Sequence, residues 1–145
     1  MYSFFLDLHN VLRWVVLLLG AAALLMAWAG ALGRGKWTPG LSRVSRIFSV
    51  AVDVQVLVGL VLYVALSPLT RTAFRDFGAA MRSSEQRFFL VEHSLLMILS
   101  AALVHVGAAR GRKLDSPLQA AIFYSLAAVA MAFAIPWWRR LVPGL

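Results

Sequence analysis

Long apolar runs separated by short polar segments dominate this sequence. A segment of about 20 apolar residues is long enough to cross a bilayer as a helix. Four runs meet this length, and they predict helices at about 6–32, 46–66, 87–109 and 116–138. Because short connections place consecutive helices side by side, the pattern predicts an all-α protein, an integral membrane up-down-up-down four-helix bundle. Residues 1–145 would form one domain.

Residues 70–86 form the longest hydrophilic connection between the runs. Its apolar residues recur at a spacing close to that of one helical face, at Phe74, Phe77, Ala80 and Met81. This spacing predicts a short amphipathic helix in the membrane interface, with an ordinary solvated loop as the alternative.

The first run needs to be distinguished from a secretion signal. Ala27-Trp28-Ala29 has the small-x-small pattern of a cleavage site. The positive charge of Arg13 lies well inside the run rather than before it. We therefore expect a retained transmembrane helix.

Composition supports a membrane protein and excludes several kinds of site. The chain is 61% hydrophobic and 14% charged, whereas soluble domains are about half apolar and a quarter charged. It has no cysteine, which excludes disulfides, thiolate metal sites, iron–sulfur clusters and covalent haem attachment. The net charge of +8 arises from basic residues placed mostly between the apolar runs. This placement favours lipid head groups over nucleic acid as the partner.

The basic residues also bear on orientation. Lys and Arg divide seven to seven between the two predicted ends of the bundle. One end concentrates six of its seven in the short loops 33–45 and 110–115, and the seventh, Arg46, directly follows the first loop. Asp115 is the only opposing charge in these loops. The positive-inside rule therefore predicts that these loops are cytoplasmic and that both termini lie on the non-cytoplasmic side.

Ionisable residues inside such runs are costly, so each is a hypothesis for a functional site. His9 and His93 lie near the starts of two helices that run in the same direction, and their imidazoles are therefore expected at similar depths. The other candidate residues at this end are Arg13, Trp14, Arg87 and Glu92.

A second, smaller polar group is predicted toward the opposite end. Asp53 and His105 lie roughly 8–10 Å from that end, at about 1.5 Å per residue, and Gln55 comes near the same level. Asp53 and His105 are expected to pair with each other as buried groups. This pairing is a structural role that requires no ligand.

Two imidazoles in an apolar slot between helices are the ligands that one haem b requires. The first and third helices are diagonal in the predicted topology, which leaves more room than neighbouring helices do. His9 and His93 are thus the predicted axial, metal-binding ligands of one haem. Arg13 and Arg87 would bind its propionates, and Glu92 would accept the second N–H of an imidazole.

Other functions remain open. His9, Glu92 and His93 would form a two-His, one-carboxylate metal site, although adjacent residues on a helix diverge. His105 and Met26 would hold a second haem. Asp53, Glu92 and His105 suit a small proton- or cation-coupled transporter.

A structural role is the last alternative. The Ala-rich stretches 20–31 and 120–134 allow close helix contacts within or between chains. This suits an accessory subunit of a larger respiratory or photosynthetic complex without its own redox centre, or a homo-oligomer. No elbow motif or triad context indicates nucleophilic catalysis, and whether the chain is an enzyme stays open.

Several short segments resemble a known group of proteins. They are Leu8-His9 with Leu12-Arg13-Trp14, the stretch 53–59, Arg87-Phe88 with Glu92-His93, His105-Val-Gly107, and Ile135-Pro136-Trp137. In these segments the chain resembles small bacterial four-helix membrane proteins labelled cytochrome b-like, loosely b561-type. The resemblance implies haem b and electron transfer with a quinol or a redox partner protein in the bacterial cytoplasmic (inner) membrane. Three histidines limit this chain to one bis-His haem.

Overall fold

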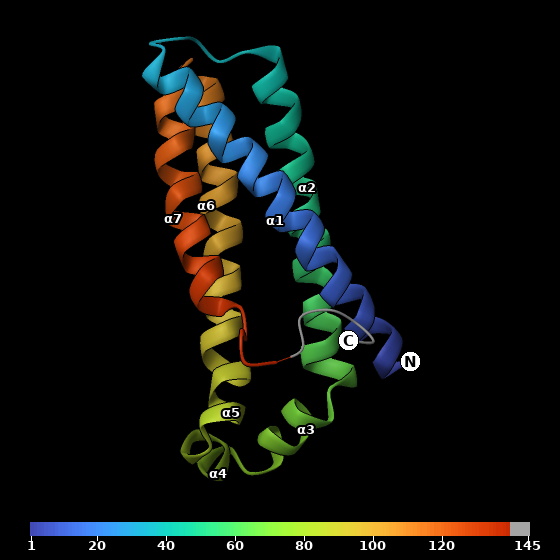
Figure 1. Ribbon diagram of the computed structural model, residues 1–145. Coiled ribbons are helices and arrows are strands. Elements are labelled where there is room, and N and C mark those ends of the chain that lie inside the picture. The colour runs from blue at the N-terminus through green and yellow to red at the C-terminus, as the bar shows by residue number, and fades with distance from the viewer. Residues whose placement is uncertain (140–145) are drawn as a thin grey trace.

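The computed structural model describes residues 1–139, and within this part of the chain the ordered elements are all helices (Figure 1). Four helical segments of the described chain are long and apolar enough to cross a membrane: Tyr2–Leu32, Pro39–Leu66, Ser84–Lys113 and Pro117–Ala134. The four apolar runs of the sequence therefore correspond to four long helical segments.

The long helices make contacts in a closed cycle. Helix α1 (Tyr2–Leu32) packs against α2 (Pro39–Val61) and α7 (Pro117–Ala134), and α6 (His93–Lys113) packs against the same two. Helices α1 and α6 therefore lie diagonally opposite each other. We call the end that carries the N-terminus and the 67–87 connection the N-terminal end, and the end that carries residues 33–38 the loop end (Figure 1).

Helix α2 begins at Pro39, seven residues before the predicted position 46. The side-chain oxygen of Thr38 accepts a hydrogen bond from the backbone N–H of Leu41, at 3.1 Å. Threonine before a proline is a favoured helix start, because the oxygen caps a free N–H and proline has none to satisfy. The predicted loop 33–45 is therefore helical over slightly more than half of its length.

The other long helices also differ from the predicted bounds at their ends. Helix α1 starts at Tyr2 rather than residue 6, and α6 continues to Lys113 rather than ending at 109. Helix α7 ends at Ala134 rather than 138 because Ile135 is extended. A residue before proline is disfavoured in the helical conformation, and Pro136 follows. The sequence Trp137-Trp138-Arg139-Arg140 predicts an interfacial anchor where the last helix exits, and Arg140 lies outside the described residues.

Two π-helical segments interrupt the long helices near the N-terminal end. Segment η1 (Leu62–Leu66) continues α2, and η2 (Phe88–Glu92) joins α5 (Ser84–Arg87) to α6. The Tyr63 hydroxyl of η1 donates to the carbonyl oxygen of Leu90 in η2, at 2.9 Å. Single π turns inside α-helices are frequent at functional sites.

The 67–87 connection folds as short helices rather than as one. Helices α3 (Pro68–Arg75) and α4 (Phe77–Arg82) are separated at Asp76, whose side chain caps α4 by accepting from the N–H of Ala79 at 2.8 Å. The predicted single helix over 70–86 is therefore wrong in its continuity. Its apolar face is also divided, because Phe77 is exposed whereas Ala80 is buried.

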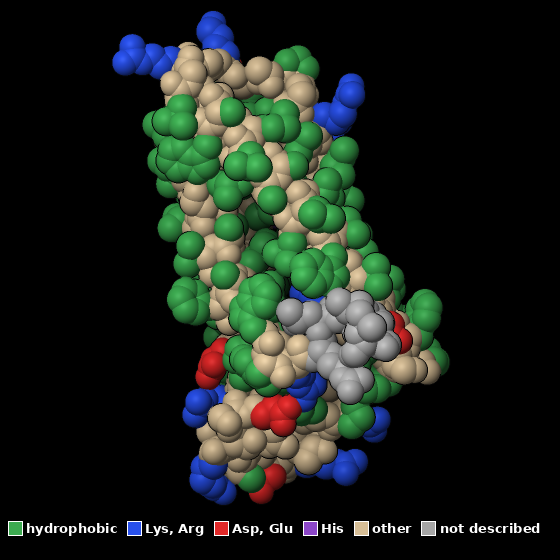
Figure 2. Space-filling view, in the orientation of Figure 1, with side chains coloured by type: hydrophobic (Ala, Val, Ile, Leu, Met, Phe, Trp, Pro, Cys, Tyr) green, Lys and Arg blue, Asp and Glu red, His purple; other side chains and the backbone are tan. Residues whose placement is uncertain are grey.

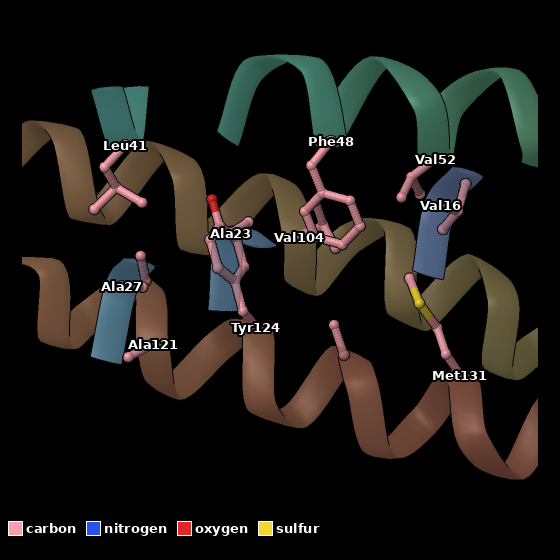
Figure 3. Close-up of a cluster of buried hydrophobic side chains, with 12 residues drawn as sticks. Val16, Ala23, Ala27, Leu41, Phe48, Val52, Val104, Ala121, Tyr124 and Met131 are labelled. Atoms are coloured by element: carbon pink, nitrogen blue, oxygen red, sulfur yellow. The ribbon is translucent and has the colours of Figure 1, made fainter. Parts of the chain in front are cut away.

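The core is built from a few large side chains among many small ones (Figure 3). Phe48 of α2 and Tyr124 of α7 meet edge to face, with ring centroids 5.7 Å apart. Close packing of α6 on α7 depends on Gly107, where an added Cβ would lie 2.9 Å from the Cβ of Phe123. Small residues let two helix backbones approach closely, which is how helices associate where the hydrophobic effect is weak.

The loop end is closed by a contact between the two connections located there. The backbone N–H of Trp37 donates to the carboxylate of Asp115, at 2.9 Å. The indole ring of Trp37 covers Gly111, where an added Cβ would come within 2.5 Å of the ring. The 33–38 segment is thus held against the end of α6.

The surface carries many large apolar side chains. Leu18 is 70% exposed and Phe133 is 73% exposed. In the view of Figure 2, hydrophobic side chains cover the middle of the molecule and most Lys and Arg side chains lie toward its two ends. Many exposed apolar side chains are typical of a surface that contacts lipid or another protein.

Candidate functional site

His9 and His93 meet across the diagonal between α1 and α6, near the N-terminal end. Their ring centroids lie 6.2 Å apart, with an angle of 65° between the ring planes. Two residues 84 positions apart in the sequence are thus placed at one depth, as the helix directions predict.

The end of α7 determines the orientation of His93. The Nδ1 atom of His93 lies 2.7 Å from the carbonyl oxygen of Ala134. A carbonyl oxygen accepts only, so Nδ1 carries the proton and Nε2 of the neutral ring keeps a lone pair. The Ala134 carbonyl needs a partner because it belongs to the last turn of a helix, where carbonyls have no N–H to bond. Pro136 ends that helix and thereby supplies the acceptor for His93.

Gln55 of α2 binds His9 through its side-chain amide. Its Nε2 atom lies 3.1 Å from the backbone carbonyl oxygen of His9 and 3.3 Å from the Nε2 atom of the His9 ring. The contact with a carbonyl identifies the donating –NH₂ group, so Nε2 of His9 accepts and Nδ1 carries the proton. Nδ1 is buried, with no hydrogen-bond partner among the described residues.

Gly59, one helical turn after Gln55, gives His9 the space it occupies. A Cβ at this position would lie 3.2 Å from Cε1 of the His9 ring. Gln55 and Gly59 thus form one face of α2 that binds the side chain and backbone of His9.

Arg13 is buried one turn after His9, with only 8% of its surface exposed. It donates to the side-chain oxygen of Asn10 at 3.4 Å, and its guanidinium carbon lies 5.8 Å from the ring centroid of Trp14. A cation inside an apolar segment is expensive, so this position is a strong candidate for binding an anionic group.

Glu92 and Arg87 bind each other instead of the imidazoles. Arg87 Nε donates to Glu92 Oε1 at 3.0 Å, and both side chains are about half exposed. The prediction that Glu92 orients an imidazole is wrong for His93, because the Ala134 carbonyl holds its N–H. Adjacent residues on a helix point about 100° apart, which turns Glu92 away from the His93 side.

Aromatic side chains surround His93. The ring centroids of Phe88 and Phe89 lie 6.0 and 5.9 Å from its ring. Trp138 packs on Phe88 at 4.6 Å, and the guanidinium of Arg139 lies over Phe89, also at 4.6 Å. The chain after α7 therefore folds back over the apolar surroundings of His93.

The second polar group contains the predicted pair but not all three predicted residues. His105 Nε2 lies 2.7 Å from Asp53 Oδ1, and their side chains are 51% and 48% exposed rather than buried. Gln55 does not belong to this group, since it contacts His9. Two positions along a helix correspond to about 200°, so Asp53 and Gln55 lie on nearly opposite faces of α2.

A three-ligand metal site is not formed. Among the described residues, no group of three or more His, Cys, Asp or Glu side chains is placed to hold one metal ion. The set His9, Glu92 and His93 fails because Glu92 pairs with Arg87. The alternative in which His105 shares a haem with Met26 has no support either, because Nε2 of His105 is engaged by Asp53.

Three contributors to the site were not predicted from the sequence as part of it. They are Gln55 at its actual position, the Tyr63 hydroxyl that links the two π segments, and the Ala134 carbonyl. The four-residue spacing of Gln55 and Gly59, which places both residues on one face of a helix, is the one sequence signal for this part of the site. The role of the Ala134 carbonyl cannot be identified from the residue types, and its only sequence signal is Pro136, which ends the helix and leaves the carbonyl without a backbone partner.

No protein-family model, curated protein or solved structure matches this chain.

Proposed function

We propose that this chain crosses the bacterial cytoplasmic membrane as an up-down-up-down four-helix bundle and binds one haem b between His9 and His93 for electron transfer. The observation that carries the proposal is the meeting of these two imidazoles, 6.2 Å apart, from diagonal helices. The loop end would face the cytoplasm, as its short basic connections favour.

The donor set fits two-sided ligation of one iron. Imidazoles that share a metal have ring centres roughly 6 Å apart, because each metal–nitrogen bond is about 2 Å long. Both Nε2 atoms carry lone pairs, since Ala134 holds the N–H of His93 and Gln55 donates to His9. Ligation would free His9 Nε2 from Gln55, whose amide would keep its bond to the His9 carbonyl.

The surrounding residues have defined roles in this proposal. The Ala134 carbonyl fixes the His93 ring and increases its strength as a ligand, as second-shell acceptors do. Arg13, which is buried one turn after His9, is the cation that we propose for a propionate. Arg87, predicted for the same role, forms an ion pair with Glu92 and is about half exposed. We assign propionate binding to Arg13 because it is buried beside His9.

A haem held by two histidines supplies a one-electron centre without an open iron position. The protein would therefore exchange electrons with a quinol or a partner protein rather than activate a bound substrate. The apolar setting of Phe88 and Phe89 limits access of water to His93.

The test is an absorption spectrum of the protein expressed with ample haem and purified in detergent, before and after reduction with dithionite. We expect a Soret band and sharp reduced α and β bands, with about one haem per chain in a pyridine haemochrome assay. His9→Ala and His93→Ala should each abolish the bands. His105→Ala is the matched control, and it should retain them because His105 pairs with Asp53 at the other end. A folded but colourless wild-type protein would refute the proposal.

A further inference from the structure

A groove of about 300 Å³ lies between α2 and α6 at the loop end, away from His9 and His93. Both helices contribute polar side chains to its lining. The lining includes Trp37, Arg46, Ser49, Asp53, His105 and Arg112.

The lining of the groove includes buried donors that have no hydrogen-bond partner among the described residues. They include the hydroxyl of Ser49, a residue only 8% exposed, and the indole Nε1 of Trp37. A serine inside a helix usually donates to the carbonyl four residues earlier, as Ser100 and Ser125 do here. Buried donors without acceptors cost free energy, so these groups point to an acceptor that enters the groove.

The charges of the groove indicate that this acceptor is anionic. Arg46 of α2 and Arg112 of α6 bring two guanidinium groups to its lining. The carboxylate of Asp53 already pairs with His105 at 2.7 Å, so it does not neutralise either arginine by contact. Guanidinium groups match the geometry of phosphate and carboxylate oxygens.

The size and position of the groove favour a phosphate group. A volume of 300 Å³ is at the lower limit for ligand pockets, which suits a head group rather than a large cofactor. The orientation proposed above places the loop end in the cytoplasm. Basic pockets between transmembrane helices on the cytoplasmic side are sites for anionic lipid head groups. We infer that this groove binds a phosphate group through Arg46, Arg112, Ser49 and Trp37, carried by an anionic phospholipid or present as free phosphate.

The experiment is native mass spectrometry of the detergent-purified full chain with dioleoyl phosphatidylglycerol or with dioleoylglycerol, which lacks the phosphate. A parallel measurement follows the unfolding temperature with inorganic phosphate against chloride. The test variant is Arg46→Gln with Arg112→Gln. The control is Arg43→Gln with Arg110→Gln, which removes the same charge from the same helices outside the groove.

We expect the wild type and the control to retain phosphatidylglycerol and not dioleoylglycerol, and the groove variant to lose about tenfold in retained lipid. Ser49→Ala, a milder change, should weaken binding in the same direction. Stabilisation by inorganic phosphate alone, lost in the groove variant, would identify free phosphate as the source. Equal retention in the groove variant and the control, or no binding of either probe, would overturn the inference.

Discussion

At the scale of single residues, the amide of Gln55 is the side-chain contact that fixes the position of His9. We predict that Gln55→Leu lowers the free energy of unfolding by about 1–3 kcal/mol, because it leaves a buried polar group without its donor. The measurement is unfolding by increasing sodium dodecyl sulfate, followed by circular dichroism. Gln119→Leu is the control, since Gln119 only accepts from the exposed Arg110. Equal losses in the two variants would show that the Gln55 contact contributes nothing specific.

The sequence predicts His9, His93 and Arg13 as neighbours because charge is rare in apolar helices and depth follows from residue counting. Depth alone wrongly grouped Gln55 with Asp53 and His105. Gln55 lies close to the level of Asp53 but on nearly the opposite face of α2, where it contacts His9. Contacts that depend on rotation about a helix axis are not determined by hydropathy. The acceptor for His93 was also hidden, because it is a backbone carbonyl.

At the scale of elements, the packing of α6 on α7 depends on a residue without a side chain. Gly107→Ala would place its Cβ 2.9 Å from the Cβ of Phe123 and 3.0 Å from the ring of Tyr124. We expect a loss of about 1–3 kcal/mol in the free energy of unfolding, the usual cost of overpacking. The same detergent titration measures it.

Gly40→Ala is the matched control for this substitution. Its nearest contact would be the terminal methyl of Met26 at 3.6 Å, an ordinary van der Waals distance. Replacing a helical glycine where space allows stabilises by about 0.5–1 kcal/mol. If Gly107→Ala stabilised the protein as Gly40→Ala does, close approach of α6 and α7 would not be a requirement of the fold.

The existence of the four long helices was readable from the sequence, whereas several of their bounds and interruptions were not. The early start of α2 is signalled by Thr38-Pro39 and not by hydropathy, because the first turns of the helix lie outside the apolar run. The π segments η1 and η2 leave hydropathy unchanged, so no apolar pattern reveals them. They matter for the site because η2 ends directly before His93, and an extra residue in a turn changes the direction in which the following side chains point.

At the scale of the whole molecule, the two ends carry different chemistry, and their placement across a membrane can be measured directly. The chain has no cysteine, so a single introduced cysteine reports its own location. We predict that Ser83→Cys, at the N-terminal end, reacts with a membrane-impermeant maleimide on intact cells whose outer membrane is permeabilised. Lys36→Cys, at the loop end, should react only after the inner membrane is broken.

These expectations follow from antiparallel helices and from the basic loops. Residue 36 lies in the connection between α1 and α2, and residue 83 between α4 and α5, at opposite ends of the molecule (Figure 1). Labelling of both positions from the same side would contradict the membrane-spanning bundle itself. Labelling in the reverse order would preserve the bundle and place His9 and His93 nearer the cytoplasm, where a haem would meet cytoplasmic rather than periplasmic redox partners. The predicted order rests on the positive-inside rule, since the loop end concentrates seven Lys and Arg residues in two short segments of the sequence.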